Sequence, residues 1–79
     1  MNLYVKTWCP WCIDAVDWLR KRGIAFTQID VLADAPAYAH MRKISSQSLT
    51  PTLEMPDGAV LADFDVRQLE RFLQERKAG

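Results

Sequence analysis

Apolar and polar positions in the first part of the chain predict a strand, a helix and a second strand. Leu3–Val5 is a short run of β-forming residues and predicts a buried first strand. From about residue 10 to residue 22, apolar residues recur at helical spacing, and Gly23 is a suitable stop after them. Residues 24–31 predict a second strand. A strand, a helix and a strand within about 30 residues form a βαβ unit, so we expect parallel strands and a right-handed crossover.

The rest of the chain predicts four more elements. They are a helix over about 34–44, strands over 52–55 and 59–62, and a helix that starts at residue 65. Asp57 and Gly58, between the two strands, are typical of a tight hairpin turn. Asp65 and Gln68 form a capping-box pair at the start of the last helix. The order βαβαββα predicts an α/β fold with a four-stranded mixed sheet and helices on both faces.

Composition and charge place the chain among ordinary globular proteins. Its 79 residues suffice for one domain, which we expect to span residues 1–79. Hydrophobic residues make up 49% and charged residues 25%, which argues against disorder. Ten basic residues balance ten acidic ones, so the basic surface expected of a nucleic-acid-binding protein is missing. With no apolar run near ~20 residues and no secretory leader, we expect a cytoplasmic protein without a membrane span.

Two cysteines form the Cys-Pro-Trp-Cys sequence of residues 9–12. Chance alone gives two cysteines this spacing about once in 40. Pro10 suits the first helical position, which makes Cys9 the N-cap of the first helix. Backbone N–H groups and the helix dipole lower the pKa of a thiol in such a position, and Lys6 would add to the effect. We therefore expect Cys9 to attack as a thiolate, and Cys12, one turn further in and less exposed, to close a disulfide with it.

The same two cysteines admit other interpretations. They are ordinary buried thiols, or they form a small structural disulfide, or they belong to a zinc site. A structural disulfide is rare in a cytosolic protein. A zinc site would have only His40 as a good third ligand, and the set of four is missing. Redox chemistry is the favoured interpretation, and no metal ligand is predicted.

The sequence around the cysteines resembles that of the glutaredoxins, the small branch of the thioredoxin-like fold. Residues 6–12, Lys-Thr-Trp-Cys-Pro-Trp-Cys, are similar to the glutaredoxin pattern Lys-x-x-Cys-Pro-Tyr-Cys, with Trp11 in the aromatic position. Residues 49–51, Leu-Thr-Pro, are similar to the Thr-Val-Pro element of the family. The hairpin turn and the closing helix also match, so the resemblance covers nearly the whole chain. It implies a thioredoxin-like fold of the size of the glutaredoxin core.

The resemblance also implies a substrate groove. Pro51 would follow a cis peptide bond and pack against the active-site disulfide, while Thr50 would offer its backbone N–H and C=O to an extended substrate. The residues that correspond to the glutathione groove of the family are Lys6, Trp11, Gln47, Thr50 and Asp65. Two positions depart from the family pattern. Ala62-Asp63 replaces a Gly-Gly pair and Ser48 stands where a basic residue is common, and both changes weaken the expected binding of glutathione.

By this resemblance the protein is expected to be a thiol–disulfide oxidoreductase, with roles in electron transport and cell redox homeostasis. The Cys9 thiolate would attack a protein disulfide or a glutathione mixed disulfide, and Cys12 or glutathione would resolve the intermediate. Either glutathione or thioredoxin reductase would then reduce the disulfide between the two cysteines. Glutathione would act as a co-substrate rather than as a bound cofactor. Expected partners are therefore glutathione, disulfide-bearing proteins and, as in some relatives, thioredoxin reductase or ribonucleotide reductase. We expect a monomer.

Two other functions are compatible with the same resemblance. A dimer could bridge an iron–sulfur cluster through Cys9 and glutathione thiols, although Pro10 disfavours this arrangement because it stiffens the turn. The domain could also be a thioredoxin-like binding module whose cysteines take no part in chemistry. A colourless, iron-free protein purified without oxygen would argue against the cluster, and negligible thiol exchange would support the binding module.

Overall fold

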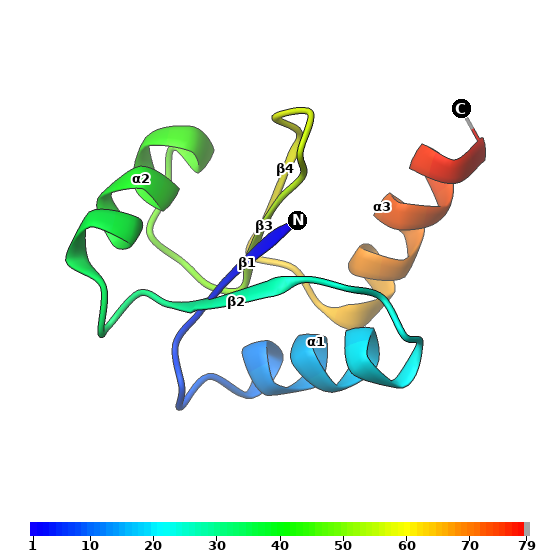
Figure 1. Ribbon diagram of the computed structural model, residues 1–79, viewed down its shortest axis with the longest axis horizontal. Coiled ribbons are helices and arrows are strands. Elements are labelled where there is room, and N and C mark those ends of the chain that lie inside the picture. Colours follow the sequence, from blue (N-terminus) through cyan, green and yellow to red (C-terminus); the bar gives the residue numbers. More distant parts are fainter. Residues whose placement is uncertain (79) are drawn as a thin grey trace.

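Residues 1–78, which the computed structural model describes, form seven elements in the order that the sequence predicts (Figure 1). The strands are β1 (Asn2–Val5), β2 (Thr27–Asp30), β3 (Thr52–Glu54) and β4 (Val60–Ala62). The helices are α1 (Pro10–Lys21), α2 (Ala35–Ser45) and α3 (Val66–Ala78). None of these helices has the length and apolar character needed to cross a lipid bilayer.

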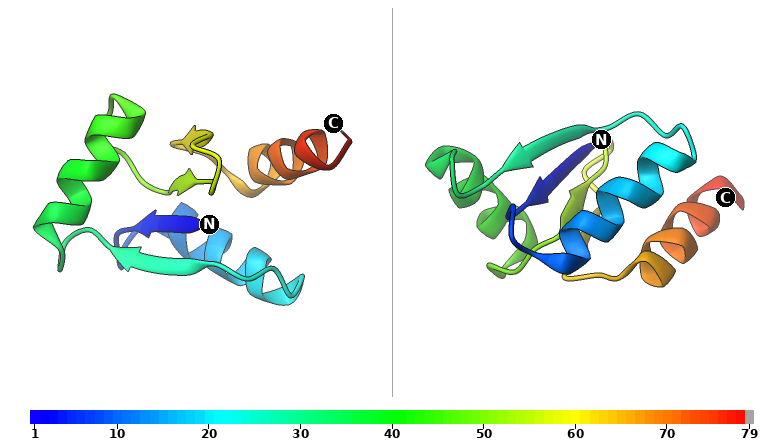
Figure 2. Two further views of the ribbon diagram at one scale, coloured as in Figure 1. Left: turned by 45° about the horizontal axis from the view of Figure 1, so that its top comes forward. Right: turned by 90° about the horizontal axis from the view of Figure 1, so that it is seen from below.

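The strands form one mixed sheet in the order β2-β1-β3-β4. β1 pairs in parallel with β2, and Asn2 lies opposite Thr27. β3 runs antiparallel to β1, with Leu3 opposite Leu53, and β4 runs antiparallel to β3. Helices α1 and α3 lie side by side on one face of the sheet, and α2 covers the other face (Figure 2). The α/β architecture with a four-stranded mixed sheet and helices on both faces is thus confirmed.

Alternate residues of β1 belong to two separate cores, one on each face of the sheet. Leu3 and Val5 are buried in the core that includes Leu19 of α1. Tyr4 is buried on the other face with Met41 of α2. Successive side chains of a strand point to opposite faces, so a continuous apolar run is expected where helices cover both faces. The central strand is therefore held rigidly, and the turn that follows it starts from a fixed point.

Strand β2 is shorter than the sequence predicts. We expected a strand over residues 24–31, but only Thr27–Asp30 is paired. Its partner β1 starts at Asn2, opposite Thr27, so residues 24–26 have no strand beside them. The N–H of Ile24 instead bonds the carbonyl of Leu19, at the end of α1. The apolar residues that suggested a longer strand pack against the core from this connection.

Each helix begins at the capping residue that the sequence predicts, and α1 ends just before Gly23 as predicted. Cys9 is the N-cap of α1, and the carboxylate of Asp34 caps α2 by accepting a backbone N–H of the first turn at 3.0 Å. Gly23 follows α1 with a φ of 66°, in the left-handed region that favours glycine. At the start of α3, Asp65 and Gln68 each accept the other's backbone N–H at 2.9 Å. These local bonds explain why the helix positions could be predicted closely.

Candidate functional site

The turn after β1 places Cys9 at the first turn of α1. The Cys9 N–H bonds the Lys6 carbonyl at 3.1 Å, and the Cys9 carbonyl accepts the N–H of Ile13 at 3.1 Å. The N–H of Cys12 donates to the sulfur of Cys9 at 3.4 Å. The sulfur therefore occupies the capping position and receives a backbone donor that the helix itself leaves free. Such a donor stabilises negative charge on the sulfur.

Both cysteines are free thiols and both are nearly covered by protein. The exposed fraction is 4% for Cys9 and 2% for Cys12, so the expected order of exposure is present but the difference is small. Burial, followed by the hydrogen bond with Cys9, raises the pKa of the Cys12 thiol to about 11. Cys12 consequently keeps its proton at neutral pH. An attack by Cys12 would first require the loss of this proton.

The loop between α2 and β3 brings Thr50 against Cys9. The Thr50–Pro51 peptide bond is cis, as the resemblance implies. The Cys9 thiol donates to the carbonyl oxygen of Thr50 across 3.7 Å. Pro51 is fully buried and Thr50 is 8% exposed. The structure therefore places the Thr50–Pro51 element next to the Cys-Pro-Trp-Cys motif, the two segments that the sequence analysis identified.

The side chain of Gln47 braces this loop from inside. Its amide nitrogen donates to the hydroxyl of Ser45 at 2.8 Å and to that of Thr52 at 3.1 Å. Its amide oxygen accepts the N–H of Leu49 at 2.6 Å. These bonds use both amide donors and one acceptor position, although we expected Gln47 to line a glutathione groove. In this structure the visible role of Gln47 is to position Thr50.

Lys6 lies at the rim of the site, directly after β1. Its ammonium group donates to the Ser48 carbonyl at 3.4 Å and lies 5.8 Å from the ring centre of Trp8 and 5.3 Å from that of Tyr38. The Tyr38 hydroxyl donates to the same carbonyl at 3.0 Å. Across residues 1–78, none of the ion pairs includes Lys6. Its charge is therefore available to an anionic group of a ligand.

The remaining predicted groove residues are Trp11 and Asp65. Trp11 is 59% exposed, in keeping with a wall beside Cys9. Asp65 caps α3, so one of its carboxylate oxygens is engaged in a backbone bond. Asp63 stands at the second position of the missing Gly-Gly pair and has a φ of 52°, a left-handed conformation that Asp tolerates better than most residues. Its negative charge is exposed near a helix N-terminus that otherwise suits an anion.

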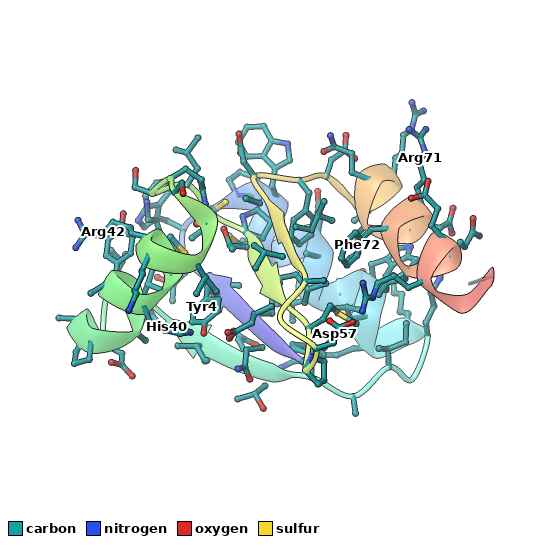
Figure 3. The ribbon with its side chains drawn as sticks, turned by 90° about the horizontal axis from the view of Figure 1, so that it is seen from above. Tyr4, His40, Arg42, Asp57, Arg71 and Phe72 are labelled. Atoms are coloured by element: carbon teal, nitrogen blue, oxygen red, sulfur yellow. The ribbon has the colours of Figure 1, made fainter. Side chains whose placement is uncertain are left out.

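Sequence reasoning did not identify Tyr38 as a neighbour of Lys6. Nor did it identify a polar cluster on the α2 face of the sheet, where Tyr4 and His40 lie close together (Figure 3). Glu54 is the centre of this cluster: its carboxylate accepts the Tyr4 hydroxyl at 2.7 Å and the Asn2 amide at 3.1 Å, and lies 3.1 Å from the His40 ring. No local sequence motif predicts these contacts, because the residues involved come from separate elements.

Contacts within this cluster change the pKa values of Glu54 and Tyr4. The hydrogen bond from Tyr4 is the main cause that holds the pKa of Glu54 below its usual range. Burial, then the bond to Glu54, raises the pKa of Tyr4 to about 12. His40 pairs with Glu54 rather than approaching the cysteines. Within residues 1–78, no three His, Cys, Asp or Glu side chains are arranged to hold a metal ion.

A pocket of about 360 Å³ borders the cysteine turn on the side of α1 that faces β2. Val5, Ile13 and Val16 supply its apolar walls, and Lys6 and Cys12 lie at the end next to the turn. The pocket therefore lies next to Cys12, and neither Cys9 nor Thr50 is among the residues that line it.

The sequence was compared with known protein families and curated proteins. A sequence model described as glutaredoxin matches residues 2–60, a range that includes both cysteines and the Thr50–Pro51 bond. One curated relative is described as an uncharacterized glutaredoxin-like 8.6 kDa protein in the rubredoxin operon of Clostridium pasteurianum. It is 25% identical over 75 residues, which cover 95% of this chain and 99% of that protein.

Two solved structures of one protein share the fold. The crystal structure of the thioredoxin-like protein BC3987 has a TM-score of 0.79 and 28% identity, and the match covers 89% of this chain and 94% of that one. The crystal structure of a point mutant of BC3987 has a TM-score of 0.81 and 29% identity, with 91% and 96% covered. The fold is therefore thioredoxin-like, as expected from the sequence.

Proposed function

Because the chain belongs to the glutaredoxin family, we propose that it is a dithiol thiol–disulfide oxidoreductase that acts through Cys9 and Cys12. The position of the Cys9 sulfur carries the proposal. It receives the backbone N–H of Cys12 at the start of α1, a donor that the helix itself leaves free. It also lies 3.7 Å from the carbonyl of Thr50, next to which the backbone of a bound substrate can run.

The reaction has two exchange steps. The Cys9 thiolate attacks one sulfur of the substrate disulfide, so that this bond breaks, a mixed disulfide forms and the departing sulfur takes up a proton. Cys12 then gives up its proton and attacks the Cys9 sulfur, which releases the second substrate thiol. Two electrons have passed to the substrate, and Cys9 and Cys12 are left as a disulfide. A raised pKa suits Cys12 to this role, because a protonated thiol does not compete with Cys9 for the first attack.

The oxidised pair is reset by glutathione or by thioredoxin reductase. With glutathione, two molecules supply the electrons and leave as glutathione disulfide. Lys6, Trp11, Thr50 and Asp65 are the proposed contacts of that co-substrate. Lys6 would offer a charge to a carboxylate, and Thr50 would offer its backbone.

The two cysteines should respond differently to replacement by serine. Cys9→Ser removes the attacking sulfur and should abolish reduction of both protein disulfides and glutathione mixed disulfides. Cys12→Ser keeps the attacking sulfur and should retain deglutathionylation, because glutathione can resolve the intermediate. Turnover with a glutathionylated peptide and with a protein disulfide measures both effects. Full turnover by Cys9→Ser would refute the proposal.

The reductant can be identified from the tryptophan fluorescence of the oxidised protein, because Trp8 and Trp11 flank the cysteines. The protein is mixed with millimolar glutathione in one cuvette and with NADPH and thioredoxin reductase in another. Potentials typical of glutaredoxins and thioredoxin differ by ~40–70 mV, or ~2–3 kcal/mol, which separates the two behaviours. Reduction by glutathione alone would show that the groove tolerates Asp63. Reduction only by the flavoenzyme would make the protein a thioredoxin-like donor.

A further inference from the structure

A pocket of about 650 Å³ lies at the end of α1 that is remote from the cysteines, and we call it the distal pocket. Four parts of the fold line it: the start of the chain, the end of α1 with the connection after it, the turn between β3 and β4, and α3. Among the residues that the structure describes, it shares no lining residue with the pocket beside Cys12. What the distal pocket binds therefore does not depend on the proposed redox chemistry.

The walls of the distal pocket are mainly apolar. Trp18, Ile24 and Leu73 contribute half-buried side chains that pack against the core on the α1 side of the sheet. Met1 and Met55 line the pocket too, and methionine side chains are flexible enough to adapt to the shape of a ligand. Pockets of ~300–1,000 Å³ with apolar walls and a few polar groups are typical sites for small organic molecules. The distal pocket therefore suits a ligand with an apolar body.

Two arginine side chains border the distal pocket, Arg22 at the end of α1 and Arg76 on α3. The guanidinium group of Arg22 lies 4.1 Å from the ring centre of Trp18 and donates to the carboxylate of Glu70 at 3.2 Å. Arg76 forms an ion pair with Asp57, on the turn between β3 and β4. Both positive charges are therefore held at the border of the pocket by neighbouring side chains.

The charges around the distal pocket favour an anion. Within residues 1–78, Glu70 is the only acidic residue that lines it, whereas two arginines do. The side chains of Arg22 and Glu70 are 47% and 45% exposed, and an ion pair that is so exposed contributes little to stability. A guanidinium group has five N–H donors, and the described part of the chain engages Arg22 through its Nη2 alone. A ligand carboxylate can therefore bind Arg22 beside Glu70 or in its place.

From these observations we propose that the distal pocket binds a small organic carboxylate with an aliphatic body. Arg22 and Arg76 supply the positive charge that attracts the carboxylate, and the apolar walls cover the aliphatic chain. A cationic ligand of the same length would meet two like charges, and a carboxylate without the chain would leave the apolar walls exposed to water. Both parts of the ligand are therefore needed for binding.

The tryptophan residues allow one spectrum to report on this pocket. Trp18 lines it, whereas Trp8 and Trp11 are exposed beside the cysteines. The reduced full-length protein, labelled with nitrogen-15, is titrated with octanoate while the indole N–H signals are followed by NMR. We expect the Trp18 signal to shift saturably, with a dissociation constant on the order of 1 mM for a ligand of this size. The signals of Trp8 and Trp11 should shift less.

Two comparison ligands separate the contributions of charge and chain. Octylammonium has the same chain with the opposite charge, and acetate has the carboxylate without the chain. Each should bind at least about tenfold more weakly than octanoate. Equal binding of octylammonium would reduce the pocket to an apolar surface, and equal binding of acetate would reduce it to an ion pair. Either result would overturn the proposal, as would a Trp18 signal that octanoate does not shift.

Charge-removing variants locate the bound carboxylate. Arg22→Gln and Arg76→Gln should each weaken octanoate binding by about three- to tenfold. Arg71→Gln is the matched control, because it removes the same charge from the same helix as Arg76→Gln. Arg71 does not line the distal pocket and points away from the body of the domain (Figure 3), so binding should not change. An equal loss in all three variants would indicate an effect of net charge and would overturn the proposed site.

Discussion

The sulfur of Cys9 lies 3.7 Å from the carbonyl oxygen of Thr50, although 41 positions separate the two residues in the chain. One residue comes from the turn after β1 and the other from the loop before β3, and these strands are paired in the sheet. The sheet therefore sets the distance between the attacking atom and the backbone beside which a substrate would lie. Substitutions that destabilise either loop should therefore lower the rate of thiol–disulfide exchange, even where the substituted residue makes no contact with a sulfur atom.

The first prediction concerns the brace formed by Gln47. Gln47→Ala removes its bonds to Ser45, Thr52 and the Leu49 N–H, and should lower the free energy of unfolding by about 1–3 kcal/mol. Exchange rates with all disulfide substrates should fall together, because Thr50 is no longer held against Cys9. Urea unfolding and the disulfide rates described above measure the two effects.

Ser48→Ala, a substitution in the same loop, is the matched control for Gln47→Ala. Ser48 contributes its backbone carbonyl to Lys6 and Tyr38, and that group survives the substitution. Stability and rates should stay close to those of the unmodified protein. If Gln47→Ala lost activity only with glutathione substrates, Gln47 would be a direct ligand and not a brace.

The second prediction concerns stability at high pH. Burial raises the pKa of Cys12 from its ordinary 9.0 to about 11, so the unfolded state loses this proton at a lower pH than the folded state. The unfolded state therefore binds fewer protons between these values, and the reduced protein should lose roughly 2 kcal/mol of stability as the pH rises from about 9 to 11. Urea unfolding of the reduced protein at a series of pH values measures the loss.

The oxidised protein and Cys12→Ser serve as controls, because neither has a Cys12 thiol to titrate. Both should show a smaller decline over the same pH range. What remains should begin near pH 10, because the pKa of Tyr4 is raised from 10.0 to about 12 and its titration lowers stability with the same sign. An equally steep decline in all three forms would show that Cys12 is not the cause.

The third prediction concerns the bond between Tyr4 and Glu54. This bond is the main cause that lowers the pKa of Glu54, so its stabilising effect is present above the ordinary value of 4.5 and is lost as the pH falls through the lowered value. Tyr4→Phe should therefore destabilise the protein by about 1–3 kcal/mol at pH 7 and by less at pH 3. Chemical unfolding at the two pH values provides the measurement.

Tyr38→Phe is the comparison for this effect. Its hydroxyl bonds a backbone carbonyl, which does not titrate. The cost of Tyr38→Phe should therefore be the same at both pH values. A cost of Tyr4→Phe that did not depend on pH would mean that the carboxylate of Glu54 is not the group it stabilises.

The fourth prediction concerns the charge of Asp63. Asp63→Asn removes the charge and keeps a residue that tolerates the left-handed conformation at φ 52°. The rate with oxidised glutathione should rise about threefold at low ionic strength, and the gain should shrink in salt because the charge is exposed. Glu75→Gln removes an exposed charge near the other end of α3 and should leave the rate unchanged. Equal effects of the two variants would indicate a general effect of net charge.

Much of the candidate site could be predicted because its parts are local. Cys9 and Cys12 share one helical turn, and Pro10 between them marks where the helix starts. The role of Thr50 and Pro51 was implied by resemblance alone, since nothing in the spacing of the chain says that they approach Cys9. Gln47 was assigned to a ligand groove, and only its bonds to Ser45, Leu49 and Thr52 show that it braces the loop.

The sequence by itself determined the order of the elements, the helix caps and the position of the redox pair. These follow from contacts between residues a few positions apart, as in the bonds between Asp65 and Gln68. Only the tertiary structure decided which segments meet around Cys9 and how far β2 extends. It also decided that the Tyr4 hydroxyl donates to the Glu54 carboxylate, a bond whose strength depends on the ionisation of that carboxylate. Those relationships depend on how the strands pair and the helices pack, so residues far apart in the chain come together only when the whole domain has folded.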